Sequence, residues 1–309
     1  MILKPIHQKN LYGLNDFFLN FVKLYQKNNL PNKILISGDE GLGKSTLAFH
    51  LVNYVLSKDE DLSYDLKNLQ INQENKSYKL TINASNPNLT LVDSLNDKRG
   101  IDINQIRDLI SNLNKSSFNN KERFVIIDNI EKLNINSVNA LLKILEEPPQ
   151  NIFFILINND RFILPTLKSR CINFNLFLNH QNTIYVVNKL LGEDIFNHIN
   201  TDLFNHYTTP GKLYKLITFF ETNNYNLKDY KLKDLLKLII NEELYKKDIL
   251  IKNISFEYFE FFFSKELYLI KSKTFDLHNY FIKRINDTKK FNLDEESLFN
   301  EFEYKVLNG

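Results

Sequence analysis

The chain has 309 residues, of which 43% are hydrophobic, 25% charged and 13% aromatic. These proportions are typical of a globular protein of two or three domains and exclude a disordered or collagen-like chain. A net charge of only +2 gives no support for a protein that binds nucleic acid by itself, because such proteins usually carry a basic excess.

A single cysteine, Cys171, excludes a disulfide framework and any zinc module that needs several cysteines. A reducing cytoplasm is the compartment expected for such a chain. The first residues lack the pattern of a signal peptide, and the longest apolar runs have the length of a strand. We therefore expect a cytoplasmic protein that binds no zinc and no membrane.

The first half alternates short apolar runs with helical patterns. Strands are predicted at residues 33–37, 89–92, 124–128, 152–157 and 171–174. A helix at 137–147 should end at Pro148 and Pro149, since proline cannot continue a helix. Continuous apolar strands separated by helices predict an α/β fold with a parallel five-stranded sheet covered on both faces.

Helical patterns alone follow residue 176 or so, with helices predicted at 182–191 and 212–220 and a polar linker at 221–227. Beyond the linker the chain is rich in aromatic residues. An apolar stripe recurs there at helical spacing and predicts a helix packed into a bundle core. The stripe consists of Phe256, Phe259, Phe263, Leu267 and Ile270. The remaining aromatics Tyr258, Phe261 and Phe262 leave open a subunit interface instead.

Residues 38–45, GDEGLGKS, match the phosphate-loop pattern G-x-x-x-x-G-K-[ST] between a predicted strand and a predicted helix. In such a loop, backbone N–H groups and the helix N-terminus bind phosphate oxygens. The Lys44 ammonium can reach the outer phosphates, and the Ser45 hydroxyl can ligate Mg²⁺. We expect a bound nucleotide, ATP or ADP, to contact Gly38, Gly41, Gly43, Lys44, Ser45 and Thr46.

Asp128 closes the third predicted strand and is the second candidate magnesium ligand. Many ATPases of this architecture have a glutamate at the next position, where this chain has Asn129. An amide can orient water but cannot accept its proton, and a lost general base typically costs about 10²–10⁴ in rate. The sequence therefore favours nucleotide binding over hydrolysis.

Three further motifs are NALLKILEEPP at 139–149, Leu164-Pro-Thr166 and Ser169-Arg170-Cys171. With these motifs the chain resembles the bacterial clamp-loader ATPase family of the AAA+ class, and within it the delta-prime subunits of DNA polymerase III. The likeness is specific over 11–56 and 100–174. It implies a nucleotide-binding domain at 1–176, a helical lid at 177–226 and a helical collar for oligomerisation at 227–309.

The resemblance also implies roles for three positions. Asn158 falls at sensor 1, which contacts the terminal phosphate or the attacking water. Arg170 falls at the arginine finger, which reaches the ATP site of the adjacent subunit. Lys212 stands where a sensor 2 arginine usually lies.

The chain departs from the family at Asn129 and Lys212, and it lacks the four-cysteine zinc module of many relatives. These departures imply a subunit that binds ATP, hydrolyses it poorly and serves as scaffold and finger donor. Its partners would be other clamp-loader subunits (gamma/tau and delta) and, through the complex, the sliding clamp and primed DNA. A self-sufficient AAA+ motor such as gamma/tau is the alternative, and Asn129 counts against it.

Overall fold

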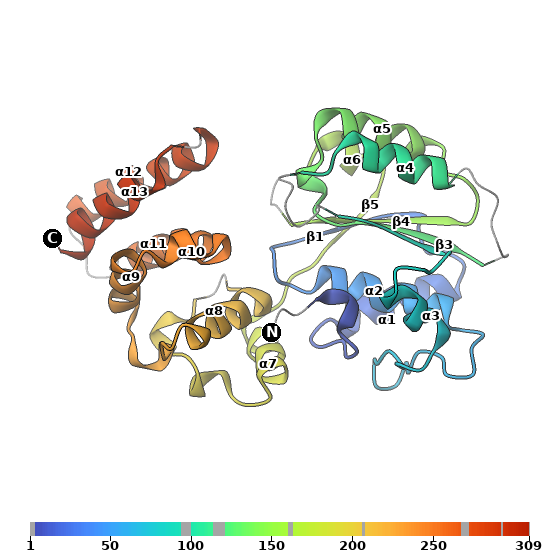
Figure 1. The fold of residues 1–309 in the computed structure, drawn as a ribbon, viewed down its shortest axis with the longest axis horizontal. Coiled ribbons are helices and arrows are strands. Elements are labelled where there is room, and N and C mark those ends of the chain that lie inside the picture. Colours follow the sequence, from blue (N-terminus) through green and yellow to red (C-terminus); the bar gives the residue numbers. More distant parts are fainter. Residues whose placement is uncertain are drawn as a thin grey trace. The chain divides into compact units, whose positions relative to one another are not determined.

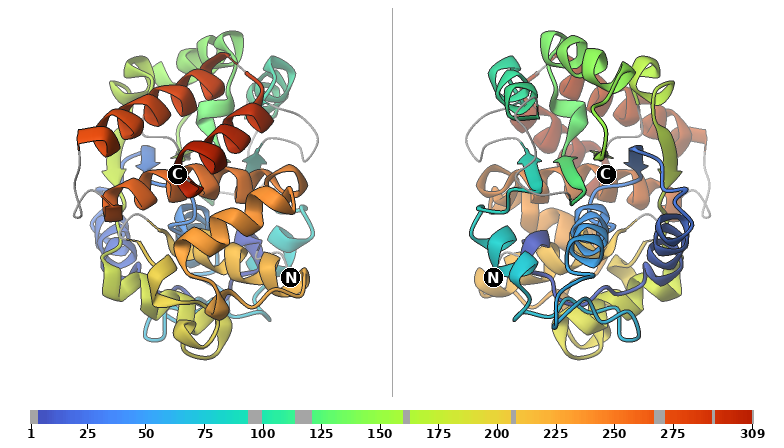
Figure 2. Two further views of the ribbon diagram at one scale, coloured as in Figure 1. Left: turned by 90° about the vertical axis from the view of Figure 1, so that its left-hand side faces the viewer. Right: turned by 90° about the vertical axis from the view of Figure 1, so that its right-hand side faces the viewer.

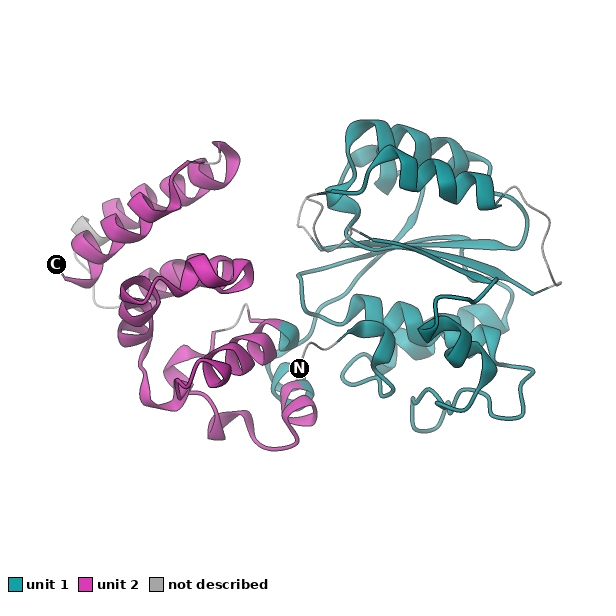
Figure 3. Ribbon diagram, in the orientation of Figure 1, with its two compact units in different colours: residues 1–186, 209–211 teal, residues 187–208, 212–309 magenta. Residues whose placement is uncertain are grey.

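The computed structural model describes residues 4–93, 100–113, 121–159, 163–205, 208–266, 272–291 and 293–308, without the side chains of 266 and 272–274. The described chain forms two compact units (Figure 3). Unit 1 comprises residues 1–186 and 209–211, and unit 2 comprises 187–208 and 212–309. The division into three domains at 1–176, 177–226 and 227–309 stays a prediction.

Unit 1 is built on a five-stranded parallel sheet, as predicted, with the strand order β2-β3-β4-β1-β5. The strands are β1 (Lys33–Ser37), β2 (Leu89–Val92), β3 (Arg123–Ile127), β4 (Ile152–Asn158) and β5 (Ile172–Asn175). Ser37, the last residue of β1, pairs with Asn158, the last residue of β4. Because the strands are parallel, their carboxyl ends meet at one edge of the sheet.

Helices cover both faces of this sheet (Figures 1 and 2). One face carries α1 (Asn15–Gln26), α2 (Lys44–Leu56) and α3 (Lys76–Ile82). The other carries α4 (Ile103–Leu113), α5 (Ile135–Glu146) and α6 (Pro165–Lys168). The α5 helix ends just before Pro148, as predicted.

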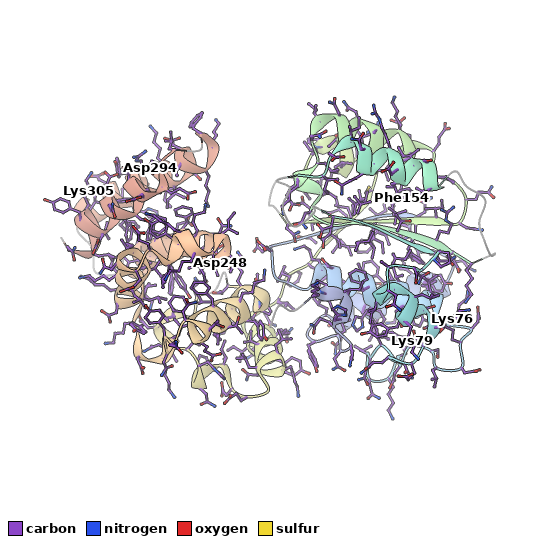
Figure 4. All side chains as sticks on the ribbon, viewed as in Figure 1. Lys76, Lys79, Phe154, Asp248, Asp294 and Lys305 are labelled. Atoms are coloured by element: carbon purple, nitrogen blue, oxygen red, sulfur yellow. The ribbon has the colours of Figure 1, made fainter. Side chains whose placement is uncertain are left out.

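Successive strand residues enter two different cores, because side chains alternate between the faces of a sheet. On β4, Ile155 and Ile157 pack with α1 and α2, whereas Phe154 and Leu156 pack with α4 and α5. Figure 4 labels Phe154, whose side chain is fully buried. This alternation decides which polar side chains meet at the carboxyl edge of the sheet.

Unit 2 is helical, as predicted for this half of the chain. The α7 helix (His180–Leu191) crosses the boundary between the units, and α8 starts at Pro210, a residue well suited to a first helical position. The helices that follow α7 are α8 (Pro210–Thr222), α9 (Leu232–Asn241), α10 (Leu244–Lys247), α11 (Ile249–Glu266), α12 (Ser272–Phe291) and α13 (Glu295–Phe302).

The aromatic stripe on α11 forms the core of this unit. Phe256, Phe259 and Phe263 are at most 2% exposed, and Phe259 stacks on Phe302 of α13 with ring centroids 3.7 Å apart. The predicted bundle core is therefore confirmed at these positions, whereas Leu267 and Ile270 lie outside the described residues.

The alternative of a subunit interface on α11 is wrong for two of its three residues. Tyr258 is fully buried and donates a hydrogen bond to the Leu203 carbonyl, and Phe262 is also buried.

In the described part of the chain, no helix has the length and apolar character needed to cross a membrane.

Candidate nucleotide-binding site

The phosphate loop joins β1 to α2, which is the context that the motif requires. Gly41 and Gly43 have φ of +87° and +88°, in the left-handed region that glycine adopts without strain. Gly43 is the N-cap of α2, so the first N–H groups of the helix follow the loop directly. Backbone donors and the positive end of the helix thus converge where a phosphate would bind.

Lys44 lies in the centre of the loop and is only 3% exposed. Its Nζ donates to the carbonyls of Gly38 and Asp39 over 2.7 and 2.6 Å. Burial lowers the pKa of Lys44 to about 8, against the opposing effect of carboxylates led by Asp128. The side chain is therefore mostly a buried cation at neutral pH, which fits a phosphate ligand.

Ser45 and Asp128 form the predicted magnesium pair. The Ser45 hydroxyl donates to Asp128 Oδ2 over 2.5 Å. Asp128 lies one residue beyond β3, and burial raises its pKa, with Asp93 adding to the shift and the bond from Ser45 opposing it. A hydroxyl and a carboxylate are oxygen ligands of the kind Mg²⁺ prefers, and Mg²⁺ usually takes its other ligands from phosphates and water. The residues therefore fit a magnesium nucleotide.

Asn129 turns the chain directly after Asp128. Its φ is +58°, a left-handed conformation that asparagine tolerates better than most residues. Its Nδ2 donates to Asp93 Oδ1 over 2.8 Å, and its Oδ1 accepts from Asn159 Nδ2 over 3.0 Å. Both ends of the amide are thus engaged within the cluster, at the position where many ATPases have a glutamate.

Asn159 and Glu131 complete this cluster, and neither was among the predicted site residues. Asn159 Nδ2 also approaches Asp128 Oδ1 at 3.5 Å, and the Asn159 N–H donates to Glu131 Oε2 over 3.1 Å. Burial raises the pKa of Glu131, while the bond from Asn159 lowers it. Asn159 therefore links Asp128, Asn129 and Glu131.

Strand alternation explains why Asn159 rather than Asn158 meets Asp128. Ile126 and Ile157 enter the core shared with α2, so the residues two further along, Asp128 and Asn159, lie on the same face as Ser45. Asn158 is 1% exposed and pairs with Ser37 on β1. The period of two along the strand was the signal that distinguishes the two asparagines. The sensor 1 role of Asn158 stays a prediction.

Arg170 follows α6 and precedes β5. Its Nη2 lies 2.5 Å from Glu146 Oε1 at the end of α5, and its Nη1 donates to the Thr166 carbonyl. The arginine side chain is 31% exposed. The guanidinium would therefore have to exchange the Glu146 carboxylate for a phosphate if it acts on a neighbouring subunit.

Lys212 belongs to unit 2, where its Nζ forms an ion pair with Glu257 Oε1 of α11 over 2.5 Å. The side chain is 13% exposed. Its sensor 2 role stays a prediction, as do the phosphate contacts of Gly38 and Thr46.

Among the described residues, no group of three or more His, Cys, Asp or Glu side chains has an arrangement that could hold a metal ion.

A family model described as DNA polymerase III, delta subunit, matches residues 14–179, which is more than half of the chain. The chain is similar to DNA polymerase III subunit delta' of Buchnera aphidicola subsp. Baizongia pistaciae, with 31% identity over 176 residues. That match covers 54% of this chain and only 51% of the relative, so it spans about half of the relative's length.

Two relatives from Buchnera aphidicola subsp. Schizaphis graminum are also similar to this chain. Its DNA polymerase III subunit delta' is 24% identical over 290 residues, covering 87% of this chain and 83% of the relative. Its DNA polymerase III subunit gamma is 31% identical over 167 residues, covering 53% of this chain and 40% of the relative.

Proposed function

The chain belongs to the DNA polymerase III delta subunit family, and on this premise we propose that it is a clamp-loader subunit of the replicative DNA polymerase. Such a subunit works in an ATP-dependent complex that places the sliding clamp on primed DNA. Its partners would be the gamma/tau and delta subunits, and it would act in the cytoplasm. Relatives named delta' and gamma support this proposal.

Within the complex, we propose that the chain binds ATP or ADP with Mg²⁺ through the phosphate loop. The observation that carries this proposal is the convergence of buried Lys44, the glycine loop and the Ser45–Asp128 pair at one helix N-terminus. The Lys44 ammonium would hold the outer phosphates, and Ser45 and Asp128 would hold the magnesium ion. Bound Mg²⁺ would neutralise phosphate charge beside the Asp128 carboxylate.

Asn159 is proposed as the residue that contacts the terminal phosphate or a water beside it. Its amide nitrogen donates to Asn129 Oδ1 and approaches Asp128 Oδ1, so it would exchange one of these partners for a ligand oxygen. Asn129 itself cannot accept a proton, so hydrolysis by this chain alone should be slow. The proposed contribution of the chain to hydrolysis is Arg170, acting on the neighbouring subunit.

Calorimetric titration with Mg·ADP tests the binding site. The wild type should bind, and Lys44→Ala should lose most of the affinity. Lys33→Ala is the matched control, because Lys33 also donates to a backbone carbonyl, that of Leu145, but lies outside the loop. Equal binding by the Lys44 and Lys33 variants, or no binding by the wild type, would contradict the site.

Reconstitution tests the assembly. The purified chain, mixed with gamma/tau and delta subunits of its own host, should elute with them as one complex in size-exclusion chromatography. Failure to assemble, together with robust ATP turnover by the isolated chain, would favour the self-sufficient motor. The complete phosphate loop is the observation that keeps this second candidate open.

A further inference from the structure

Residues Thr209–Gly211 lie against the middle of the phosphate loop, although about 170 residues of sequence separate them. Thr209 Oγ1 donates to the Glu40 carbonyl over 2.6 Å, and the Gly211 N–H donates to the Gly41 carbonyl over 2.9 Å. The three residues belong to unit 1, whereas the chain on either side of them belongs to unit 2. We call Thr209–Gly211 the strap.

The strap approaches the loop too closely for any side chain at position 211. A Cβ atom on Gly211 would lie 2.7 Å from Gly41 Cα and 2.9 Å from the Gly41 carbonyl oxygen. Neither atom can move aside, because both belong to the backbone of the loop. Thr209, only 3% exposed, adds a buried hydroxyl bond one residue earlier in the loop. The contact is therefore specific for a small residue and a hydroxyl.

Peptide geometry links these two contacts to phosphate binding. In a planar trans peptide, the C=O of one residue and the N–H of the next point in opposite directions. The Glu40 carbonyl points to the strap, so the Gly41 N–H points away from it. The Gly41 carbonyl also points to the strap, so the Leu42 N–H points away as well. The strap thus fixes two successive N–H groups on the opposite side of the loop, an arrangement that binds anions.

We propose that the strap positions the Gly41 and Leu42 N–H groups for the phosphate chain of a magnesium nucleotide, with Thr209 and Gly211 as positioning residues. This proposal rests on the nucleotide binding proposed above. It attributes part of the affinity to contacts between the strap and the loop backbone. The Lys212 ammonium, which follows the strap in sequence, is paired with Glu257 within unit 2.

Mg·ADP titration of the full chain tests the strap. Thr209→Val keeps the shape of the side chain but removes the donor, and it should weaken binding by about three- to tenfold, the loss expected for one hydrogen bond. Thr209→Ser restores the hydroxyl and should restore the affinity. Thr218→Val is the matched control, because the Thr218 hydroxyl bonds to carbonyls of its own helix α8. Gly211→Ala should weaken binding more than Thr209→Val.

Hydrogen exchange without nucleotide supplies a second readout. Thr209→Val should speed amide exchange in peptides that cover the loop and the strap, and Thr218→Val should leave both unchanged. If Thr209→Val binds with wild-type affinity while Lys44→Ala remains defective, the positioning role of the strap is wrong, but the proposed nucleotide binding still holds. No binding by the wild type overturns both proposals. The pair of Thr209 variants decides the question even if Gly211→Ala does not fold.

Discussion

The Ser45 hydroxyl donates a hydrogen bond to Asp128 Oδ2, although 83 residues separate the two in sequence. The bond joins the first turn of α2 to the end of β3 and places both magnesium candidates at the carboxyl edge of the sheet.

Asp128→Asn should weaken Mg·ADP binding by roughly ten- to a hundredfold, because a charged ligand of the ion is lost. The fold should tolerate the change, since burial already disfavours the charged form of Asp128 and raises its pKa. Titrations with Mg²⁺ and with EDTA check this result. The variant and the wild type should differ with Mg²⁺ and agree in EDTA, and a difference of equal size in both would rule out the magnesium role.

Asn159→Ala should weaken ATP binding more than ADP binding, by about two- to tenfold, because it removes one hydrogen bond near the terminal phosphate. Asn158→Ala should instead lower the melting temperature, since it removes a fully buried polar side chain. Paired titrations and thermal unfolding of both variants separate the roles. If Asn158→Ala, and not Asn159→Ala, weakened ATP binding more than ADP binding, the sensor 1 role would belong to Asn158.

Hydrolysis by the isolated chain should be slow or undetectable, because the Asn129 amide bonds to Asp93 and Asn159 and cannot take a proton from water. Steady-state phosphate release measures this. Robust turnover by the wild type would support the motor alternative. A slow Asn129→Glu variant would not contradict the prediction, since in the proposed mechanism the arginine finger comes from another subunit.

Arg170→Ala should leave folding and Mg·ADP binding of this chain almost unchanged, because an exposed ion pair contributes about 0–1 kcal/mol to stability. In the reconstituted complex it should depress ATP turnover at one site, where a finger in trans is worth about 10³–10⁵ in rate. Glu146→Gln is the companion variant, because it frees the guanidinium from its carboxylate while keeping Arg170.

Clamp-dependent ATPase and clamp-loading assays with wild-type partners measure both variants. Glu146→Gln should retain or raise turnover. Normal clamp loading by the complex with Arg170→Ala would mean that Arg170 is only a surface cation. Loss of the chain's own ADP binding would mean that Arg170 acts on the nucleotide site of this chain rather than on that of a neighbour.

Stability should fall in acid through His50, which is fully buried between the Tyr64 hydroxyl and the Gln8 carbonyl. Burial lowers the pKa of His50 to about 4, below its usual 6.5. The unfolded chain therefore binds more protons between these values, so this contribution is complete above pH 6.5 and is lost as the pH falls towards 4. The loss amounts to at most about 3 kcal/mol of unfolding free energy.

Urea unfolding between pH 7 and 4 checks this sign. His50→Gln should reduce the slope of stability against pH in that window, whereas His7→Gln, at an exposed position, should not. An unchanged slope in His50→Gln would mean that other groups cause the acid loss.

Local sequence was sufficient for the parallel sheet and the phosphate loop. Apolar runs of strand length and helical periodicity are properties of neighbouring residues, and the glycines of the loop serve a turn that spans eight residues. The Ser45–Asp128 pair was also predictable, because parallel strands bring their carboxyl ends to one edge. Asn159 could have been found from strand alternation, which places it on the face of Asp128.

The partners of Arg170 and Lys212 and the position of the strap depended instead on tertiary packing. Glu146, Glu257 and the Glu40 carbonyl lie 24, 45 and 169 residues from the groups they bond. Such pairs depend on which helix ends and loops pack together, and no local pattern encodes that choice. Local sequence thus accounts for the chemistry available at the phosphate loop, whereas packing sets which distant groups bond to that loop, to Arg170 and to Lys212.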